Sequence, residues 1–352
     1  RFSEEKIKTV GFDIDRKKVK MLNSGISYIN HINQVEIKNA INNEFIAKYK
    51  FNHISFVDII IICVPTPWSD NNSPDISFIQ KTIKSILPFI KKNQLLILQS
   101  STYPGTTEEE IIPTIEKSGF NIGQDYFIGY SPEREDPGNK NYTTKNIPKV
   151  VSGYSSKCLK LVVLLYSQII DEVIPVSSLK IAEISKILEN SYRAVNIALI
   201  NEFKIVADKM DIDIYEVIKA ASTKPFGFTA YYPGPGIGGH CIPIDPLFLK
   251  WKANEVGLNT RLIELASEIN NSMPLYFVNK TIEILNIKNI PIEDSSVLIL
   301  GVSYKKNIDD IRESPALKII FELKKLGSNV KYSDSYLPTI PKTRKFNINL
   351  NS

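Results

Sequence analysis

The first half of this chain alternates short apolar segments with amphipathic ones, and this constrains the fold more than any other feature. The run of residues 59–64 is wholly apolar, which is typical of a parallel strand buried on both faces. It is far shorter than the roughly 20 residues of a membrane-spanning helix. The expected strands are 7–13, 57–64, 95–99 and segments near Phe127 and Val150, and the expected helices are 15–23, 76–90, 106–118 and 157–167. Strands that alternate with helices predict an α/β fold with a doubly wound parallel sheet.

The pattern changes after residue 177. A long apolar-periodic helix is expected over 179–210, and further helices over 215–221 and 246–285. A second strand–helix–strand unit follows, at 296–304, 315–326 and 330–333. We therefore predict two Rossmann-like doubly wound domains, 1–177 and 289–352, joined by a helical middle domain, 178–288.

Both Rossmann-like domains are expected to be incomplete. A dinucleotide-binding domain usually begins strand, GxGxxG, helix, strand, acid, and here only the last two parts are found, with Asp13 ending the strand. Residues 1–3 fit the end of the preceding helix, so the first strand and its glycine loop are expected upstream of Arg1. The second domain is expected to be truncated after its second strand, which also ends in an acid, Asp334. An acid at Asp13 favours NAD over NADP, because it would repel a 2′-phosphate.

Composition excludes several classes of protein. The 352 residues carry a formal net charge of +5 and are 43% hydrophobic, which suits a globular protein that binds an anionic small molecule. No cluster of Lys and Arg is interleaved with aromatics, so neither a nucleic-acid partner nor a membrane partner is expected. The three cysteines are too few for a disulfide framework and lack zinc-ligand spacing, so no metal is expected and a reducing cytoplasm is predicted.

One cysteine lies in a segment rich in glycine and proline. Residues 231–246 contain Cys241, and Asp245 follows it by four residues. Glycines let a backbone approach a ligand closely, and prolines stiffen the turn. A thiol held in this way is a candidate nucleophile. A buried structural cysteine in a connector is the alternative.

Several motifs, distant in sequence and in the expected order, resemble the UDP-glucose/GDP-mannose dehydrogenase family, the nucleotide-sugar 6-dehydrogenases. They cover essentially the whole chain: 11–15, 64–67, 101–105, 130–138, Lys186 with Asn190, 238–241, and Tyr304-Lys305 with 312–314. Two stretches, 131–139 and 224–228 leading into 232–236, look like the UDP-N-acetylglucosamine 6-dehydrogenase branch.

The resemblance implies an NAD-dependent, four-electron oxidation of a sugar C6 alcohol to a uronic acid. The expected substrate is a UDP-N-acetyl-hexosamine, UDP-GlcNAc, and the product a precursor of surface polysaccharide. Cys241 would capture the aldehyde as a thiohemiacetal, which is oxidised to a thioester and released by water. Lys186 and Asn190, four residues apart on one helix face, would hold the developing oxyanion.

The resemblance also assigns the remaining site residues. Thr102 and Glu133 would place and deprotonate water, and Asp245 would orient this network. NAD would be held by Asp13, Lys18, Thr66, Pro67, Thr102 and Arg312. The UDP-sugar would contact Glu133, Lys186, Asn190, Tyr232, Gly234, Gly236, Gly238, Tyr304 and Lys305. The long helix resembles the family's dimer interface, so a homodimer or higher homo-oligomer is expected.

Two departures redirect substrate choice. UDP-glucose dehydrogenases carry Lys where this chain has Ile244, and often a second Glu where it has Pro137. Substitution of that Glu by Glu135 or Asp136 and absence of its role are the two alternatives. Both differences are typical of the acetamido-sugar branch. His240 is interpreted as a substrate-contact or structural residue. UDP-glucose or UDP-ManNAc is the alternative substrate, and an inactive, truncated nucleotide-sugar-binding remnant is the alternative function.

Overall fold

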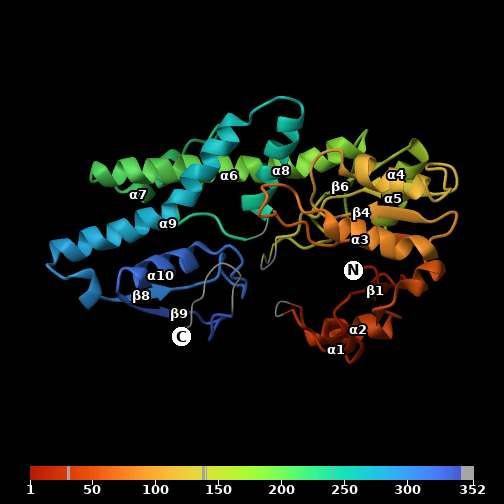
Figure 1. Cartoon of the computed structure of the whole chain (residues 1–352), viewed down its shortest axis with the longest axis horizontal. Coiled ribbons are helices and arrows are strands. Elements are labelled where there is room, and N and C mark those ends of the chain that lie inside the picture. The colour runs from red at the N-terminus through yellow and green to blue at the C-terminus, as the bar shows by residue number, and fades with distance from the viewer. Residues whose placement is uncertain (30–31, 137–138, 140, 240, 342–352) are drawn as a thin grey trace. The chain divides into compact units, whose positions relative to one another are not determined.

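The computed structural model describes residues 1–29, 32–136, 139, 141–239 and 241–341 (Figure 1). The chain divides into two compact units, Arg1–Ile187 and Leu188–Ser352. Helix α6 (Leu179–Lys209) contributes residues to both. The predicted division into three domains by residue range stays a prediction.

The main sheet of the first unit has the strand order β3-β4-β5-β6-β7. Strands β3 (Ile59–Ile62), β4 (Leu95–Leu98) and β5 (Phe127–Tyr130) are parallel. Strand β6 (Lys149–Gly153) runs antiparallel to β5, and β7 (Val173–Pro175) is parallel to β6. The predicted parallel sheet therefore contains one antiparallel pair, β5 with β6. A parallel neighbour needs a crossover, usually helical, and no described residue of the connection 131–148 is helical.

Helices cover both faces of this sheet. Successive residues of β4 point to opposite sides, as in any strand: Leu96 and Leu98 belong to one buried apolar cluster, and Leu95 and Ile97 to another. The first cluster includes residues of α3 (Ser77–Ile86) and α4 (Ile112–Glu116), and the second includes residues of α5 (Ser156–Tyr166). This confirms the doubly wound α/β arrangement.

A second, two-stranded parallel sheet is made by β1 (Val10–Phe12) and β2 (Ile46–Lys48). It carries α1 (Arg16–Asn23) and α2 (Gln34–Asn42). Among the residues described, β1 pairs only with β2, and β3 only with β4. Neither α2 nor β2 was predicted from the sequence. Both are short, and α2 has no buried residue, so its sequence lacks the apolar periodicity of a packed helix.

The second unit combines helices with a small sheet. Its helices are α7 (Ile214–Ala221), α8 (Cys241–Glu255), α9 (Arg261–Ile287) and α10 (Pro315–Lys325), and its parallel strands are β8 (Ser296–Leu300) and β9 (Asn329–Ser333). Helix α10 packs against α9 (Figure 1). The single helix predicted over 246–285 is in fact two, separated near Gly257, which has a φ of +74°. The first of them begins at Cys241, five residues earlier than predicted.

A buried chain of amide hydrogen bonds holds the glycine-rich segment before Cys241. The Gly234 N–H donates to Asn201 Oδ1 at 3.0 Å, and Asn201 Nδ2 donates to Asn270 Oδ1 at 3.0 Å. Asn270 Nδ2 in turn donates to the carbonyl of Ala194 at 3.0 Å. Both asparagines are buried, so the segment is fixed to α6 and α9 by groups that cannot exchange these bonds for water.

We predict that Asn270→Leu lowers the free energy of unfolding by about 1–3 kcal/mol for each buried partner it leaves unsatisfied. The partner left unsatisfied is the Asn201 amide, whereas the Ala194 carbonyl still accepts the backbone N–H four residues on in α6. Urea denaturation measures the change. Asn271→Leu, at the exposed neighbouring position, is the control and should stay within about 0.5 kcal/mol of the wild type. Equal effects of the two substitutions would contradict the prediction.

Candidate active site

Cys241 is the first residue of α8 and is exposed. It therefore does not lie in a loop, as predicted, and it is not the buried structural cysteine of the alternative interpretation. Amides at a helix N-terminus are unpaired and carry partial positive charge, which stabilises a thiolate placed there. Asp245 lies one turn further along α8 and is buried.

The glycines before Cys241 allow close packing onto the segment that follows β8. A Cβ on Gly238 would lie 2.5 Å from Tyr304 Cβ and 3.0 Å from the Glu313 carbonyl oxygen. Gly239 has a φ of +85°, and its N–H donates to the carbonyl of Arg312 at 2.8 Å. The structure thus brings the cysteine turn together with two residues expected to contact ligands, Tyr304 and Arg312.

Arg312 forms an ion pair with Asp310 two residues before it. Its Nε and Nη2 donate to Asp310 Oδ2 at 2.9 and 2.6 Å. These hydrogen bonds, and more weakly the charges of Asp310, Tyr304 and Cys241, raise the pKa of Arg312 above its usual value.

Asn190 and Asp245 form a buried pair. Asn190 Nδ2 donates to Asp245 Oδ2 at 2.6 Å, and the two side chains are 3% and 2% exposed as residues. The carboxylate fixes the orientation of the carboxamide. Lys186 lies one turn before Asn190 on α6 and is half-buried, so both residues lie on one face of that helix.

Two threonines follow the ends of β3 and β4. Thr66 Oγ1 donates to the carbonyl of Ser101 at 2.5 Å. Thr102 is buried, and its hydroxyl has no hydrogen-bond partner among the described residues. An unsatisfied buried hydroxyl is costly, and such a group at the carboxyl edge of a parallel sheet fits a ligand that supplies the missing bond.

Asp13 follows β1 at the corresponding edge of the small sheet. Its Oδ1 accepts from the Asp15 N–H at 2.8 Å, while its Oδ2 lies 3.8 Å from the Lys18 ammonium. The side chain is about one third exposed, so the second oxygen remains open to a ribose hydroxyl. Pro67 is half-buried, and its carbonyl accepts from the Asp75 N–H at 2.9 Å.

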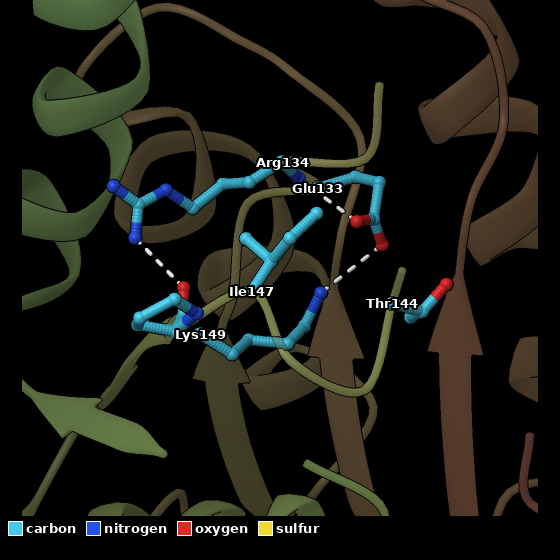
Figure 2. Close-up of a pocket in the computed structure, with 6 residues that line it drawn as sticks. Glu133, Arg134, Thr144, Ile147 and Lys149 are labelled. Atoms are coloured by element: carbon cyan, nitrogen blue, oxygen red, sulfur yellow. Dashed lines mark hydrogen bonds and ion pairs between the residues drawn. The ribbon is translucent and has the colours of Figure 1, made fainter. Parts of the chain in front are cut away.

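Glu133 accepts hydrogen bonds through both of its carboxylate oxygens (Figure 2). Its Oε1 accepts from the N–H groups of Arg134 and Glu135 at 2.8 and 3.0 Å. Its Oε2 accepts from Lys149 Nζ at 3.1 Å and from Gln99 Nε2. Burial opposes ionisation, but the Lys149 charge and the hydrogen bonds outweigh it and lower the pKa of Glu133. Glu133 is thus ionised at neutral pH, as a proton acceptor must be.

Glu183, a fully buried acid on α6, was not predicted as a site residue. Its carboxylate accepts from the Gly105 N–H at 2.5 Å, the Thr107 N–H at 3.0 Å and the Thr107 hydroxyl at 2.7 Å. It therefore ties the segment after Thr102 to the helix that carries Lys186. The sequence pattern that could have indicated Glu183 is an acidic residue among the apolar residues of α6. Neither Lys149 nor Gln99 gave a signal.

The remaining predicted residues are characterised by their backbone conformation or exposure. Gly236 has a φ of +123°, and a Cβ there would lie 2.9 Å from the Asn270 carbonyl oxygen. Tyr232 is exposed, and Lys305 and Ile244 are half-buried. His240 and Pro137 lie outside the described residues. Within the described ranges, no group of three or more His, Cys, Asp or Glu could hold a metal ion, and no helix is long and apolar enough to cross a membrane.

Two Rossmann-like sheets, and a cysteine at a helix start beside a buried amide–carboxylate pair, define the class of a dinucleotide-dependent oxidoreductase. Three domain models of one family match along the chain: the NAD binding domain at 1–170, the central domain at 180–272 and the UDP binding domain at 298–352. The chain belongs to the UDP-glucose/GDP-mannose dehydrogenase family. It is an NAD-dependent nucleotide-sugar 6-dehydrogenase, and the resemblance inferred from the motifs is confirmed.

Similar proteins cover most of the chain. Protein CapL of Staphylococcus aureus is 39% identical over 331 residues, which are 94% of this chain and 77% of that protein. The UDP-N-acetyl-D-glucosamine 6-dehydrogenase of Pseudomonas aeruginosa is 36% identical over 93% of this chain and 77% of its own. The structure of a UDP-ManNAc dehydrogenase from Pyrococcus horikoshii superimposes with a TM-score of 0.89 at 30% identity, covering 95% of this chain and 79% of that one.

Glu183 predicts a pH dependence of stability. Burial, and then the nearby Glu108 charge, raise its pKa to about 7, although its three hydrogen bonds oppose this rise. A raised pKa means that the folded state holds the proton more tightly than the unfolded one. The stabilisation from Glu183 is therefore complete below its unfolded pKa, and is lost as pH rises through about 7.

In the wild type, the contribution of Glu183 should lower the free energy of unfolding by on the order of 3 kcal/mol as pH rises from about 4.5 to 7. We expect this decline to be absent in Glu183→Gln. Urea denaturation across this pH range measures the decline. Glu116→Gln, an exposed acid at the end of α4, should leave it unchanged. Parallel curves for wild type and Glu183→Gln would refute the assignment.

Proposed function

We propose that this enzyme oxidises the C6 alcohol of a UDP-N-acetyl-hexosamine, UDP-GlcNAc, to the uronic acid for synthesis of surface polysaccharide. The observation that carries the proposal is the exposed Cys241 at the start of α8, with the buried Asn190–Asp245 pair one turn away along the helix. NAD, when bound, accepts the hydride in each of the two oxidations.

In this proposal Cys241 is the covalent nucleophile. Its thiolate adds to the C6 aldehyde, so that a C–S bond forms and the carbonyl oxygen becomes an oxyanion. Lys186 and the Asn190 amide, oriented by Asp245, stabilise that oxyanion. After the second oxidation, water attacks the thioester, its proton passes to Glu133, and the C–S bond breaks to regenerate the thiolate. Thr102 helps to place the water.

We assign NAD binding to Asp13, Lys18, Thr66, Pro67, Thr102 and Arg312. The open oxygen of Asp13 suits a ribose hydroxyl, and the unsatisfied Thr102 hydroxyl suits a polar group of the cofactor or the attacking water. The hydrogen bond from the N–H of Gly239, two residues before Cys241 in sequence, to the Arg312 carbonyl supports a position of Arg312 at the reacting end of the cofactor.

We assign UDP-sugar binding to two groups of residues. The first consists of the cysteine turn and the segment it packs against: Tyr232, Gly234, Gly236, Gly238, Tyr304 and Lys305. The close packing of Gly238 on Tyr304 supports this grouping. The second consists of the catalytic Glu133, Lys186 and Asn190.

The choice of an acetamido sugar rests on local sequence and on relatives. Ile244 is apolar and half-buried next to Asp245, where UDP-glucose dehydrogenases carry Lys. The similar proteins include a UDP-N-acetyl-D-glucosamine 6-dehydrogenase and a UDP-N-acetyl-D-mannosamine dehydrogenase. UDP-ManNAc is therefore the second candidate, ahead of UDP-glucose.

We further propose that two copies of the chain associate through α6. Large apolar side chains are exposed along this helix at intervals of three, four or seven residues: Ile181, Ile184, Leu188, Tyr192, Leu199, Phe203 and Val206. A continuous apolar stripe on a 31-residue helix suits a second copy of itself, because the same surface is self-complementary about a two-fold axis. The three free cysteines support a reducing cytoplasmic location.

We expect Cys241→Ser to abolish formation of the uronic acid, while UDP-sugar affinity stays within a few-fold of wild type. The hydroxyl is a far weaker nucleophile than the thiolate at neutral pH. Coupled NADH absorbance and product mass spectrometry measure turnover, and calorimetry measures binding. Cys158→Ala, which removes a thiol buried in α5, should retain turnover. Full acid production by Cys241→Ser would rule out covalent catalysis, and an inactive wild type that still binds the UDP-sugar would support the remnant alternative.

We expect kcat/KM for UDP-GlcNAc to exceed that for UDP-glucose by tenfold or more, since a matched or missing apolar contact is worth roughly 1–3 kcal/mol. Initial rates with UDP-GlcNAc, UDP-ManNAc and UDP-glucose decide the order. Ile244→Lys should reduce the ratio of kcat/KM for UDP-GlcNAc to kcat/KM for UDP-glucose. A preference of the wild type for UDP-glucose would overturn the substrate assignment and leave the family intact.

A further inference from the structure

Four side chains form a hydrogen-bonded cluster at the edge of the main sheet, in which Tyr166 and Lys149 are buried and the Glu133 side chain is 40% exposed. The Tyr166 hydroxyl donates to Gln99 Oε1 at 2.9 Å, and Gln99 Nε2 donates to Glu133. Lys149 Nζ donates to the same Glu133 oxygen at 3.1 Å and lies 5.2 Å from the centre of the Tyr166 ring. The cluster joins the end of β4, the segment after β5, the start of β6 and the end of α5.

Stability alone does not explain Lys149. Its side chain is 6% exposed, and moving an ammonium out of water costs several kcal/mol that a single ion pair repays only in part. Its other hydrogen bond, to the Pro132 carbonyl at 3.4 Å, is long. Well-packed apolar residues of similar volume usually replace a buried ion pair at no loss of stability.

Lys149 is the cation whose side chain contacts the Glu133 carboxylate. Arg134 is adjacent in sequence, but its Nη1 donates to the Pro148 carbonyl at 2.8 Å, and its side chain extends away from the carboxylate in Figure 2. Within the described part of the chain, Cys63 also faces the cluster, and Tyr166 is a titratable member of it. Both hold their protons at neutral pH: burial, and then Glu133, raise the pKa of Cys63 to about 11 although that residue is partly open to solvent, and burial raises the pKa of Tyr166.

We propose that Lys149 is a positioning residue that, with Gln99 and Tyr166, fixes Glu133 as an anion in one orientation for activation of the hydrolytic water. This rests on the proposed role of Glu133. The two backbone N–H groups on Oε1 set the orientation of the carboxylate, and Lys149 and Gln99 on Oε2 hold it there. Release of the uronic acid then depends on Lys149, whereas the capture of the aldehyde by Cys241 does not.

The first experiment measures Glu133 directly and needs no substrate. Protein labelled with 13C at glutamate side-chain carboxyls is titrated by NMR, and the Glu133 signal is identified by its loss in Glu133→Gln. In Lys149→Met the titration midpoint of Glu133 should rise by about one unit or more. Lys149→Arg should keep the wild-type midpoint within a few tenths of a unit. Lys160→Met, which removes an exposed lysine from α5, is the control for loss of one charge.

The second experiment measures the reaction. In Lys149→Met the acidic limb of the kcat profile for acid formation should move to higher pH by the same amount, with KM for the UDP-sugar unchanged. Below that limb, mass spectrometry should find the sugar covalently attached to Cys241, because hydrolysis has become the slow step. Lys149→Arg should restore the profile.

An unchanged Glu133 midpoint in folded Lys149→Met overturns the inference, and so does a loss of activity that is equal at all pH values. If Lys149→Met does not fold, Lys149→Gln keeps a hydrogen-bond donor without the charge and should give the same upward shift. If the wild type forms no uronic acid from any UDP-sugar, the proposed function fails, while the NMR titration still decides whether Lys149 holds Glu133 ionised.

Discussion

The structure depends on hydrogen bonds from three buried polar side chains along α6. Glu183, Asn190 and Asn201 are spaced seven and eleven residues apart, which keeps them on one stripe of the helix. Each binds a different functional segment: the turn after β4, the acid of α8, and the glycine-rich segment before Cys241. Another stripe of the same helix exposes large apolar residues. The helix also buries apolar residues, among them Ile187 and Ala198, so its buried side combines core packing with these hydrogen bonds.

The sequence predicted the main elements well where periodicity was strong. The expected helix over 179–210 is α6, and the expected helix over 315–326 is α10. The start of α8 was missed, because glycines and prolines around Cys241 are typical of a loop. Proline is tolerated in the first turn of a helix, where its missing N–H costs nothing. The reversal of β6 was missed because strand periodicity is the same in either direction.

The site was predictable only where a motif marked it. Asp13 and Asp334 illustrate the limit, because each is an acid directly after a strand, β1 and β9 respectively, and the two look equivalent in sequence. In the structure Asp334 accepts from the N–H groups of Val302 and Tyr336, both at 2.8 Å, and these bonds, against the effect of burial, lower its pKa. Asp13 keeps one oxygen open. Lys149 and Glu183 find their partners far away in sequence, so no local pattern indicates them.

The reversed strand β6 gives the sheet an unusual edge. In a wholly parallel sheet, the ligand edge receives only the ends of strands, and most of its side chains stand on the connections that follow. Because β6 runs the other way, with Tyr130 opposite Ser152, its first residue, Lys149, reaches that edge from within a hydrogen-bonded ladder. The backbone of such a residue is already ordered by folding, at a cost of about 1–2 kcal/mol that a loop residue would meet on binding. The reversal of β6, which β7 shares, thus places a charge at this edge on a strand and not on a loop.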